Sequence, residues 1–308
     1  MGMAADPRGA KEVAKYLARE KKEYSELKEK DKKYFDLTRL TNPYPDSYIH
    51  VDDGRKDVKR IVAGIDIDAG EILMATQLGE RGKKIDLAIS HHPTGNALAS
   101  LHEVMEMSTG VFESFGLPIH VAEKVMGDRI QEVGRSVHAA NHHRAVDIAR
   151  ILGINYMSTH TITDNLVNQF LEDLFKKEKP ETVGEMMDIL MEQPEYQEAK
   201  RRGAGPKIIA GNRHKKIGKY LVEMTGGTEP SAQVYEEFSR IGYSTIVSMH
   251  MREDALKRVN EQHMNVIIAG HMSSDSLGMN LFLDELEKKG VEIIPCGGLI
   301  RVSRNKRK

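Results

Sequence analysis

The stretch Ile85-Asp-Leu-Ala-Ile-Ser-His-His-Pro93 is the most informative part of this chain of 308 residues. Its first six residues form an apolar run typical of a buried β-strand, and this run leads directly into His91 and His92. Neighbouring side chains of a strand point to opposite faces, but the backbone can turn once the strand ends. The two imidazoles could then bind one metal ion, or one ion each, or they could simply cap the strand.

Two later stretches repeat this design. Tyr156-Met-Ser-Thr-His-Thr-Ile-Thr-Asp164 places His160 after an apolar run, and Val266-Ile-Ile-Ala-Gly-His-Met-Ser-Ser-Asp275 places His271 in the same way. In an open α/β sheet, ligands bind beyond the carboxyl ends of the strands. We therefore expect the three loops to meet over one crevice and to hold metal there.

In both later stretches a histidine precedes an aspartate by four residues, as in His160 with Asp164 and His271 with Asp275. This spacing brings both side chains onto one face of a helix. Imidazole and carboxylate together suit zinc, iron or manganese. Each pair alone has an ordinary alternative, because Asp164 could cap the helix that follows it. The repetition of the design at three strand ends favours metal binding.

The surrounding segments predict an α/β fold. A strand at 60–68, a helix at 70–82 and the strand from Ile85 give a β-α-β order, which favours a parallel or mixed sheet. Other expected elements are a charged helix at 10–33, a helix at 99–115, a short strand at 117–123, a long helix at 127–152 that contains His142 and His143, and a helix at 216–224.

We expect four regions along the chain. They are a helical N-terminal extension at 1–45, a first α/β region at 46–175, a helical connection at 176–206 and a C-terminal α/β region at 207–308.

Composition narrows the possible functions. The formal net charge is −1 and 6% of residues are aromatic, a balance that argues against nucleic acid as a partner. The single cysteine, Cys296, fits a reducing compartment. No apolar run approaches the roughly 20 residues that a membrane span needs. We expect a cytoplasmic protein that does not bind a membrane.

The three stretches, taken in order, resemble the NGG-interacting factor three-like family, whose members are also described as type-two homologues of GTP cyclohydrolase I. The matching motifs are Asp, strand and Ser-His-His-Pro at 66–93, His-Thr-x-x-Asp at 160–164, and strand, Gly-His-x-x-x-acidic at 266–275. The resemblance spans about 61–300 and leaves out the N-terminal extension.

The resemblance implies two α/β subdomains, with mixed or parallel sheets, that face a central metal cleft. It implies two divalent ions (Zn, Fe or Mn) with a bridging carboxylate, and a homo-oligomer, often a hexamer. The implied metal ligands are His91, His92, Asp164, His271 and Asp275. The family description suggests hydrolytic opening of the imidazole ring of GTP.

Two positions depart from the family pattern. The last acidic ligand is usually Glu, but Asp275 stands here and is one methylene shorter. The family's usual Thr-Gly-Asp turn is replaced by Ser248-Met-His-Met-Arg-Glu-Asp254. We interpret His250 in this stretch as a loop histidine, with a polar group at the site as the alternative.

These features predict a metal-dependent hydrolase of a small, nucleotide-like molecule whose identity the sequence does not give. His160 is the candidate catalytic residue, as a proton carrier or as a group that orients a ligand, because it lies one turn from Asp164. The alternative is a non-catalytic metal-binding scaffold or regulatory protein that works through partners.

Overall fold

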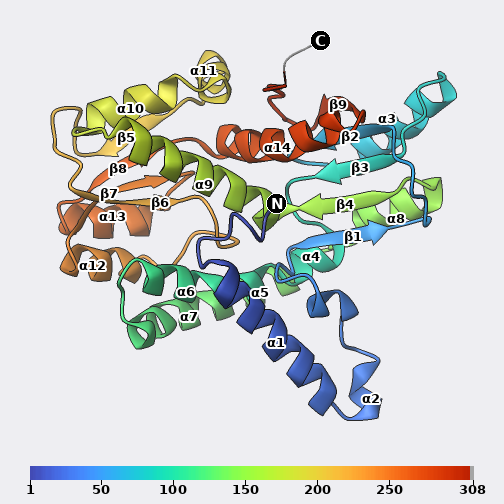
Figure 1. Cartoon of the computed structure of the whole chain (residues 1–308), viewed down its shortest axis with the longest axis horizontal. Helices are drawn as coiled ribbons and strands as arrows, with labels where there is room; N and C mark the ends of the chain where they lie inside the picture. The colour runs from blue at the N-terminus through green and yellow to red at the C-terminus, as the bar shows by residue number, and fades with distance from the viewer. Residues whose placement is uncertain (306–308) are drawn as a thin grey trace.

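The computed structural model describes residues 1–305 and has two mixed β-sheets at its centre (Figure 1). The five-stranded sheet has the order β1-β4-β3-β2-β9, and the four-stranded sheet has the order β5-β8-β7-β6. The predicted α/β class with mixed sheets is therefore confirmed.

The first sheet is parallel except at one edge, where β1 pairs with β4 in antiparallel orientation. Its central strands are buried runs because helices cover both faces of the sheet, as expected for parallel strands. The strands are β1 (Ser47–Val51), β2 (Arg60–Gly64), β3 (Leu87–Ser90), β4 (Tyr156–Thr159) and β9 (Glu292–Cys296).

The second sheet has the same plan, with the antiparallel edge strand β5 beside β8. Its strands are β5 (Lys207–Ala210), β6 (Lys219–Glu223), β7 (Tyr243–Ser248) and β8 (Asn265–Ile268). The helix predicted at 216–224 is wrong, because this segment contains β6. Its Tyr-Leu-Val run pairs in parallel with Thr245-Ile-Val of β7, and these contacts outweigh the helical spacing.

Helices cover both faces of each sheet. On the first sheet, α3 (Ala69–Glu80) and α8 (Arg144–Leu152) pack on one face, and α14 (His271–Lys288) packs on the other. On the second sheet, α9 (His160–Glu178) and α10 (Val183–Met191) cover one face. The opposite face is covered by α6 (Met107–Ser114), α7 (Ile119–His138), α12 (Gln233–Arg240) and α13 (Glu253–Glu261).

The helices α9 and α14 connect the two sheets. Helix α9 leaves β4 of the first sheet and packs on the second, whereas α14 leaves β8 of the second sheet and packs on the first (Figure 1). The two helices come very close at Gly278, where an added Cβ would lie 2.3 Å from the carbonyl oxygen of Thr163. This close packing fixes the first turns of both helices relative to each other.

Two further predictions in the middle of the chain are wrong. The segment predicted as a strand at 117–123 instead begins α7, because Pro118 provides a suitable start and Ala122, Val125 and Met126 bury one helical face. The long helix predicted at 127–152 is two helices, α7 and α8. His142 and His143 lie between them, and His142 bonds back to the carbonyl oxygen of Val137.

The helix predicted at 99–115 is also interrupted. It consists of the short helices α4 (Gly95–Ala99) and α5 (Leu101–Val104), followed by α6. The last helix of the predicted connection, α11 (Pro194–Arg201), packs on α14.

The N-terminal region forms an arm that extends from the body (Figure 1). It contains α1 (Ala10–Glu26), α2 (Glu29–Lys32) and the 3-10 turn η1 (Leu37–Leu40), so the helix predicted at 10–33 is interrupted near Leu27. An ion pair of 2.8 Å between Arg39 and Glu20 holds η1 against α1. Within the described residues, no helix combines the length and apolar character that a membrane span requires.

The last strand returns to the first sheet. Residues of β9 pair with β2, and the Arg60 side chain bonds to Glu292, which is 232 positions away. Sheet membership therefore does not follow the order of the four predicted regions, because β9 comes after the whole second sheet. The boundaries of those regions stay a prediction.

Candidate metal centre

The three sequence stretches meet where the sheets face each other. His91 and His92 lie just past β3, where their amide groups donate to the carbonyl oxygens of Gly64 and Ile65 at 2.9 Å. Asp164 lies one turn into α9, and Asp275 lies one turn into α14. Strand ends and the first turns of two helices thus position all the predicted site residues together.

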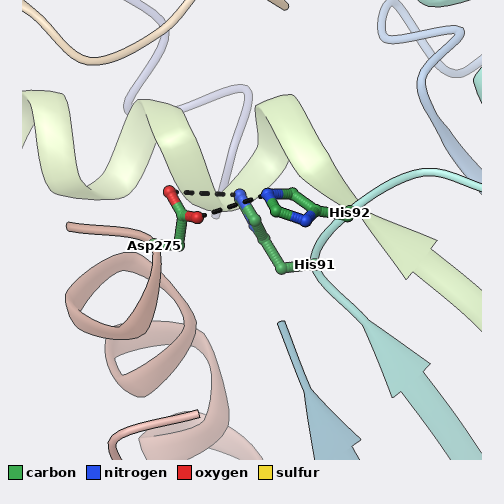
Figure 2. Close-up of side chains that lie close together, drawn as sticks. All are labelled: His91, His92 and Asp275. Atoms are coloured by element: carbon green, nitrogen blue, oxygen red, sulfur yellow. Dashed lines mark ion pairs between the residues drawn. The ribbon is translucent and has the colours of Figure 1, made fainter. Parts of the chain in front are cut away.

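Asp275 is the central residue of the cluster, and it is fully buried. Its Oδ1 lies 3.5 Å from Nε2 of His91, and its Oδ2 lies 3.4 Å from Nε2 of His92 (Figure 2). The same Oδ2 lies 3.4 Å from Nε2 of His271. Each carboxylate oxygen of Asp275 therefore faces a different group of imidazoles, which is the arrangement required for a bridging ligand.

Nε2 of His91 carries no proton and faces the carboxylates of Asp164 and Asp275. The hydroxyl of Thr163 donates to the carbonyl oxygen of Thr159, so it accepts from Nδ1 of His91 at 2.8 Å. Nε2 of His91 then carries a lone pair, 3.4 Å from Oδ1 of Asp164 and 3.5 Å from Oδ1 of Asp275. None of these three buried atoms has a hydrogen-bond partner among the described residues. Three acceptors that face one another would be stabilised by a cation between them.

His92 is oriented in the same way. Its Nδ1 donates to Asp66 at 2.8 Å, and this hydrogen bond is the main reason that the pKa of Asp66 is lowered. Nε2 of His92 therefore faces Nε2 of His271 at 3.4 Å, together with Oδ2 of Asp275. A hydrogen-bonded carboxylate behind a metal-binding imidazole is a common arrangement in metal sites, because it fixes the tautomer and the ring.

His160 is itself part of the cluster of candidate ligands. Its Nδ1 donates to the buried Asp46 at 2.8 Å, and Asp46 also accepts from the hydroxyl of Thr161. Nε2 of His160 lies 3.9 Å from Oδ2 of Asp164. His91, His160 and Asp164 form one group of potential ligand atoms, and His91, His92 and Asp275 form another. The geometry therefore adds metal binding to the roles open to His160.

The imidazoles of the cluster differ in their electrostatics. Against the lowering effect of burial, the carboxylates of Asp275 and Asp66 raise the pKa of His92 to about 9. Burial lowers the pKa of His91, and burial, opposed by Asp275, lowers the pKa of His271 to about 4. Burial raises the pKa of Asp164, and the carboxylates of Asp275 and Asp46 raise it further. A bound divalent cation would remove this repulsion, and metal ligands must be deprotonated in any case.

A cavity of about 50 Å³ adjoins the cluster, which is room for a few water molecules. Asp164, His271 and Asp275 line it. Glu223, the last residue of β6, and His250, just past β7, also line it. His250 thus lines the site, as the alternative interpretation of this residue anticipated, and its ring centroid lies 4.9 Å from that of His271.

The donor set fits divalent metal ions of the zinc, iron or manganese type, since it combines imidazoles and carboxylates without a thiolate. Sequence reasoning missed the roles of Asp46 and Thr163, which orient the ligands. Asp46 is 114 positions away from His160, so no local pattern could have revealed their pairing.

The fold is similar to that of known structures. A NIF3 superfamily protein from Sphaerobacter thermophilus matches with a TM-score of 0.72 and 26% identity, over 83% of this chain and 92% of that one. Reduced HcgD from Methanocaldococcus jannaschii matches with a TM-score of 0.52 and 16% identity, over 85% and 93%, which shows a likeness of fold alone. No family model and no curated protein matches the sequence. The motifs and the first of these structures agree, and the chain is a member of the NIF3-like (NGG-interacting factor three-like) family.

Proposed function

We propose that the protein is a metal-dependent hydrolase of a small, nucleotide-like molecule, with two divalent ions held by His91, His92, Asp164, His271 and Asp275. One observation carries the proposal. Both oxygens of the buried Asp275 lack a hydrogen-bond partner among the described residues. Oδ1 lies 3.5 Å from Nε2 of His91, and Oδ2 lies 3.4 Å from Nε2 of His92 and of His271.

Two bridged ions would supply a water of lowered pKa and would stabilise the attacking and leaving oxygens of a hydrolysis. The chain's own residues would do the rest. Asp66 and Thr163 hold His92 and His91 in the tautomer that leaves Nε2 free. His160, held by Asp46, offers Nε2 beside Asp164 and would bind metal or move a proton there.

The test combines metal content with turnover. The purified protein is loaded with Zn, Mn or Fe, its metal content is measured by elemental analysis, and nucleotides and phosphoesters are screened. We expect two ions per chain and turnover that Asp275→Asn abolishes. Asp254→Asn, an exposed aspartate, is the control. Absence of turnover with every metal at full occupancy would rule out the enzyme.

A non-catalytic role in assembly is the second candidate, and the N-terminal arm supports it. Tyr34 and Leu37 on this arm are 79% and 59% exposed, so these large side chains are available for contact with another chain. If the arm joins copies into a homo-oligomer, the double variant Tyr34→Ser and Leu37→Ser will reduce the mass in solution measured by light scattering. Lys30→Ser on the same arm is the control, and an unchanged mass would exclude the arm as the interface.

A further inference from the structure

Glu223 carries a buried carboxylate that lies outside the groups of candidate metal ligands. It is the last residue of β6, so it reaches the same edge of the second sheet as His271. Its Oε2 accepts a hydrogen bond of 2.8 Å from the hydroxyl of Tyr235. Its Oε1 is buried and accepts no hydrogen bond from any residue in 1–305. A buried acceptor without a donor is costly, and in native proteins such an atom often marks a functional position.

The neighbouring Glu229 differs from Glu223 because its charge is balanced. Glu229 is 5% exposed, and its Oε1 accepts from the amide of Arg252 at 2.8 Å. Its Oε2 lies 3.5 Å from Nε of Arg252 and 3.6 Å from Nδ1 of His250. Glu223 has no ion pair with any described residue. Burial raises the pKa of Glu223 to about 7 and the nearby Glu229 adds to this effect, whereas the hydroxyls of Tyr235 and Ser248 and the ring of His250 lower it.

Two hydroxyl groups of the cavity have hydrogen-bond partners. The hydroxyl of Thr225 donates to Asn165 at 2.6 Å, and the hydroxyl of Ser248 donates to the carbonyl oxygen of His250 at 3.0 Å. None of the described residues that line the cavity is lysine or arginine. Glu223 and Glu229 therefore give the cavity an acceptor surface in addition to the candidate metal ligands. An anionic group would be repelled there, whereas an N–H donor or a cation would be stabilised.

We propose that Glu223 is the recognition residue for a nitrogen group of the ligand, an amidine, amine or amide N–H, that enters the cavity beside the metal cluster. An N–H of such a group donates to the free Oε1 of Glu223, while the hydroxyl of Tyr235 holds Oε2 in place. The proposal rests on the proposed function for the identity of this ligand as the substrate. It assigns negatively charged parts of that substrate to the metal side of the site.

The experiment uses small probes of opposite charge and nearly equal shape, acetamidinium and acetate. Their affinities for zinc-loaded protein are measured by saturation-transfer NMR, with zinc content checked by elemental analysis. Zinc neutralises Asp164 and Asp275, so the remaining cation site is the one at Glu223. We expect Glu223→Gln to weaken acetamidinium binding at least tenfold and to leave acetate binding unchanged or stronger. Glu285→Gln, an exposed glutamate on α14, is the matched control and should change neither affinity more than twofold.

Glu223→Asp provides a second test, because it keeps the charge and withdraws it by one methylene. It should also weaken acetamidinium binding, which a purely long-range charge effect would not do. Acetamidinium affinity within twofold of wild type in Glu223→Gln would overturn the proposal. So would an equal loss of both probes, which would mean only a disturbed cavity. If zinc does not bind, the proposed function fails, and the probe measurements on metal-free protein still test Glu223.

Discussion

Asp275 is the residue on which the proposed metal centre depends most. Its two oxygens face separate sets of ligands, whereas Asp164 contacts only the group that contains His91 and His160. Asp275→Asn should therefore lower the metal content at both positions, and Asp164→Asn should lower it at one. Elemental analysis of the purified variants measures this difference. Asp275→Glu restores the residue usual in the family and should keep both ions. Equal losses in the two asparagine variants would contradict a bridging role.

Asp46 acts through His160, which it holds by a hydrogen bond of 2.8 Å. Asp46→Asn keeps the size of the side chain but exchanges one carboxylate oxygen for an NH2 donor. The tautomer of His160 is then no longer fixed. We expect a loss of about 10–100-fold in metal affinity, measured by chelator competition. In the background of His160→Ala, the same substitution should have little further effect. Additive losses in the double variant would show that Asp46 acts elsewhere.

The raised pKa of Glu223 also leads to a prediction about the stability of the protein. Its pKa is raised from 4.5 to about 7 in the folded protein, so the folded state binds this proton more tightly than the unfolded state does. The contribution of Glu223 to the free energy of unfolding therefore falls as pH rises from 4.5 towards 7. Glu223→Gln, which does not titrate, should be more stable than wild type at pH 8 by up to about 3 kcal/mol.

The gain from Glu223→Gln should shrink towards zero near pH 4.5. Urea unfolding of metal-free protein at several pH values measures the difference, with Glu285→Gln as the control. A difference between Glu223→Gln and wild type that does not change with pH would contradict the raised pKa.

At the scale of elements, the contact between α9 and α14 controls the geometry of the site. A Cβ at Gly278 would lie 2.3 Å from the backbone of Thr163, so Gly278→Ala must push the two helices apart. We expect the free energy of unfolding to fall by about 2 kcal/mol or more, and the metal affinity to fall with it. Gly127→Ala in α7 is the control, since its Cβ would meet no atom within 4 Å, and it should stabilise the protein by about 0.5–1 kcal/mol. Equal effects of the two substitutions would exclude a role for the contact.

The elements that sequence predicted well are those with a strong local signal. Buried parallel strands such as β2 and β3 appear as continuous apolar runs in the sequence. The five candidate ligands follow strands of this kind and lie near one another in the structure, and their binding of metal stays a prediction. The segments at 117–123 and 216–224 are short and apolar, and periodicity alone does not separate strand from helix in such runs. Their structures are decided by tertiary contacts, the burial of α7 on the second sheet and the pairing of β6 with β7. Glu223 and Asp46 could not be predicted because their roles depend on residues far away in sequence.

At the scale of the whole molecule, neither half contains the complete first sheet or the complete candidate site. A fragment of residues 1–206 lacks β9, His271 and Asp275, and a fragment of residues 207–308 lacks α9 and the partner strand of β9. We expect neither fragment alone to unfold cooperatively or to bind metal with the affinity of the full chain. Circular dichroism with urea titration, and metal binding, measure this. Cooperative unfolding of the separate C-terminal fragment would show that it is an autonomous domain.

The return of β9 to the first sheet has a consequence for synthesis on the ribosome. Strand β2 is made early, but its outer edge stays unpaired until residues 292–296 have been made and have left the exit tunnel. During that interval the nascent chain carries an apolar edge that other chains could pair with. The charged residues Arg60 and Lys59, at the start of that edge, are in a position to discourage such pairing. The metal centre is completed at the same late stage, because α14 must also be made first.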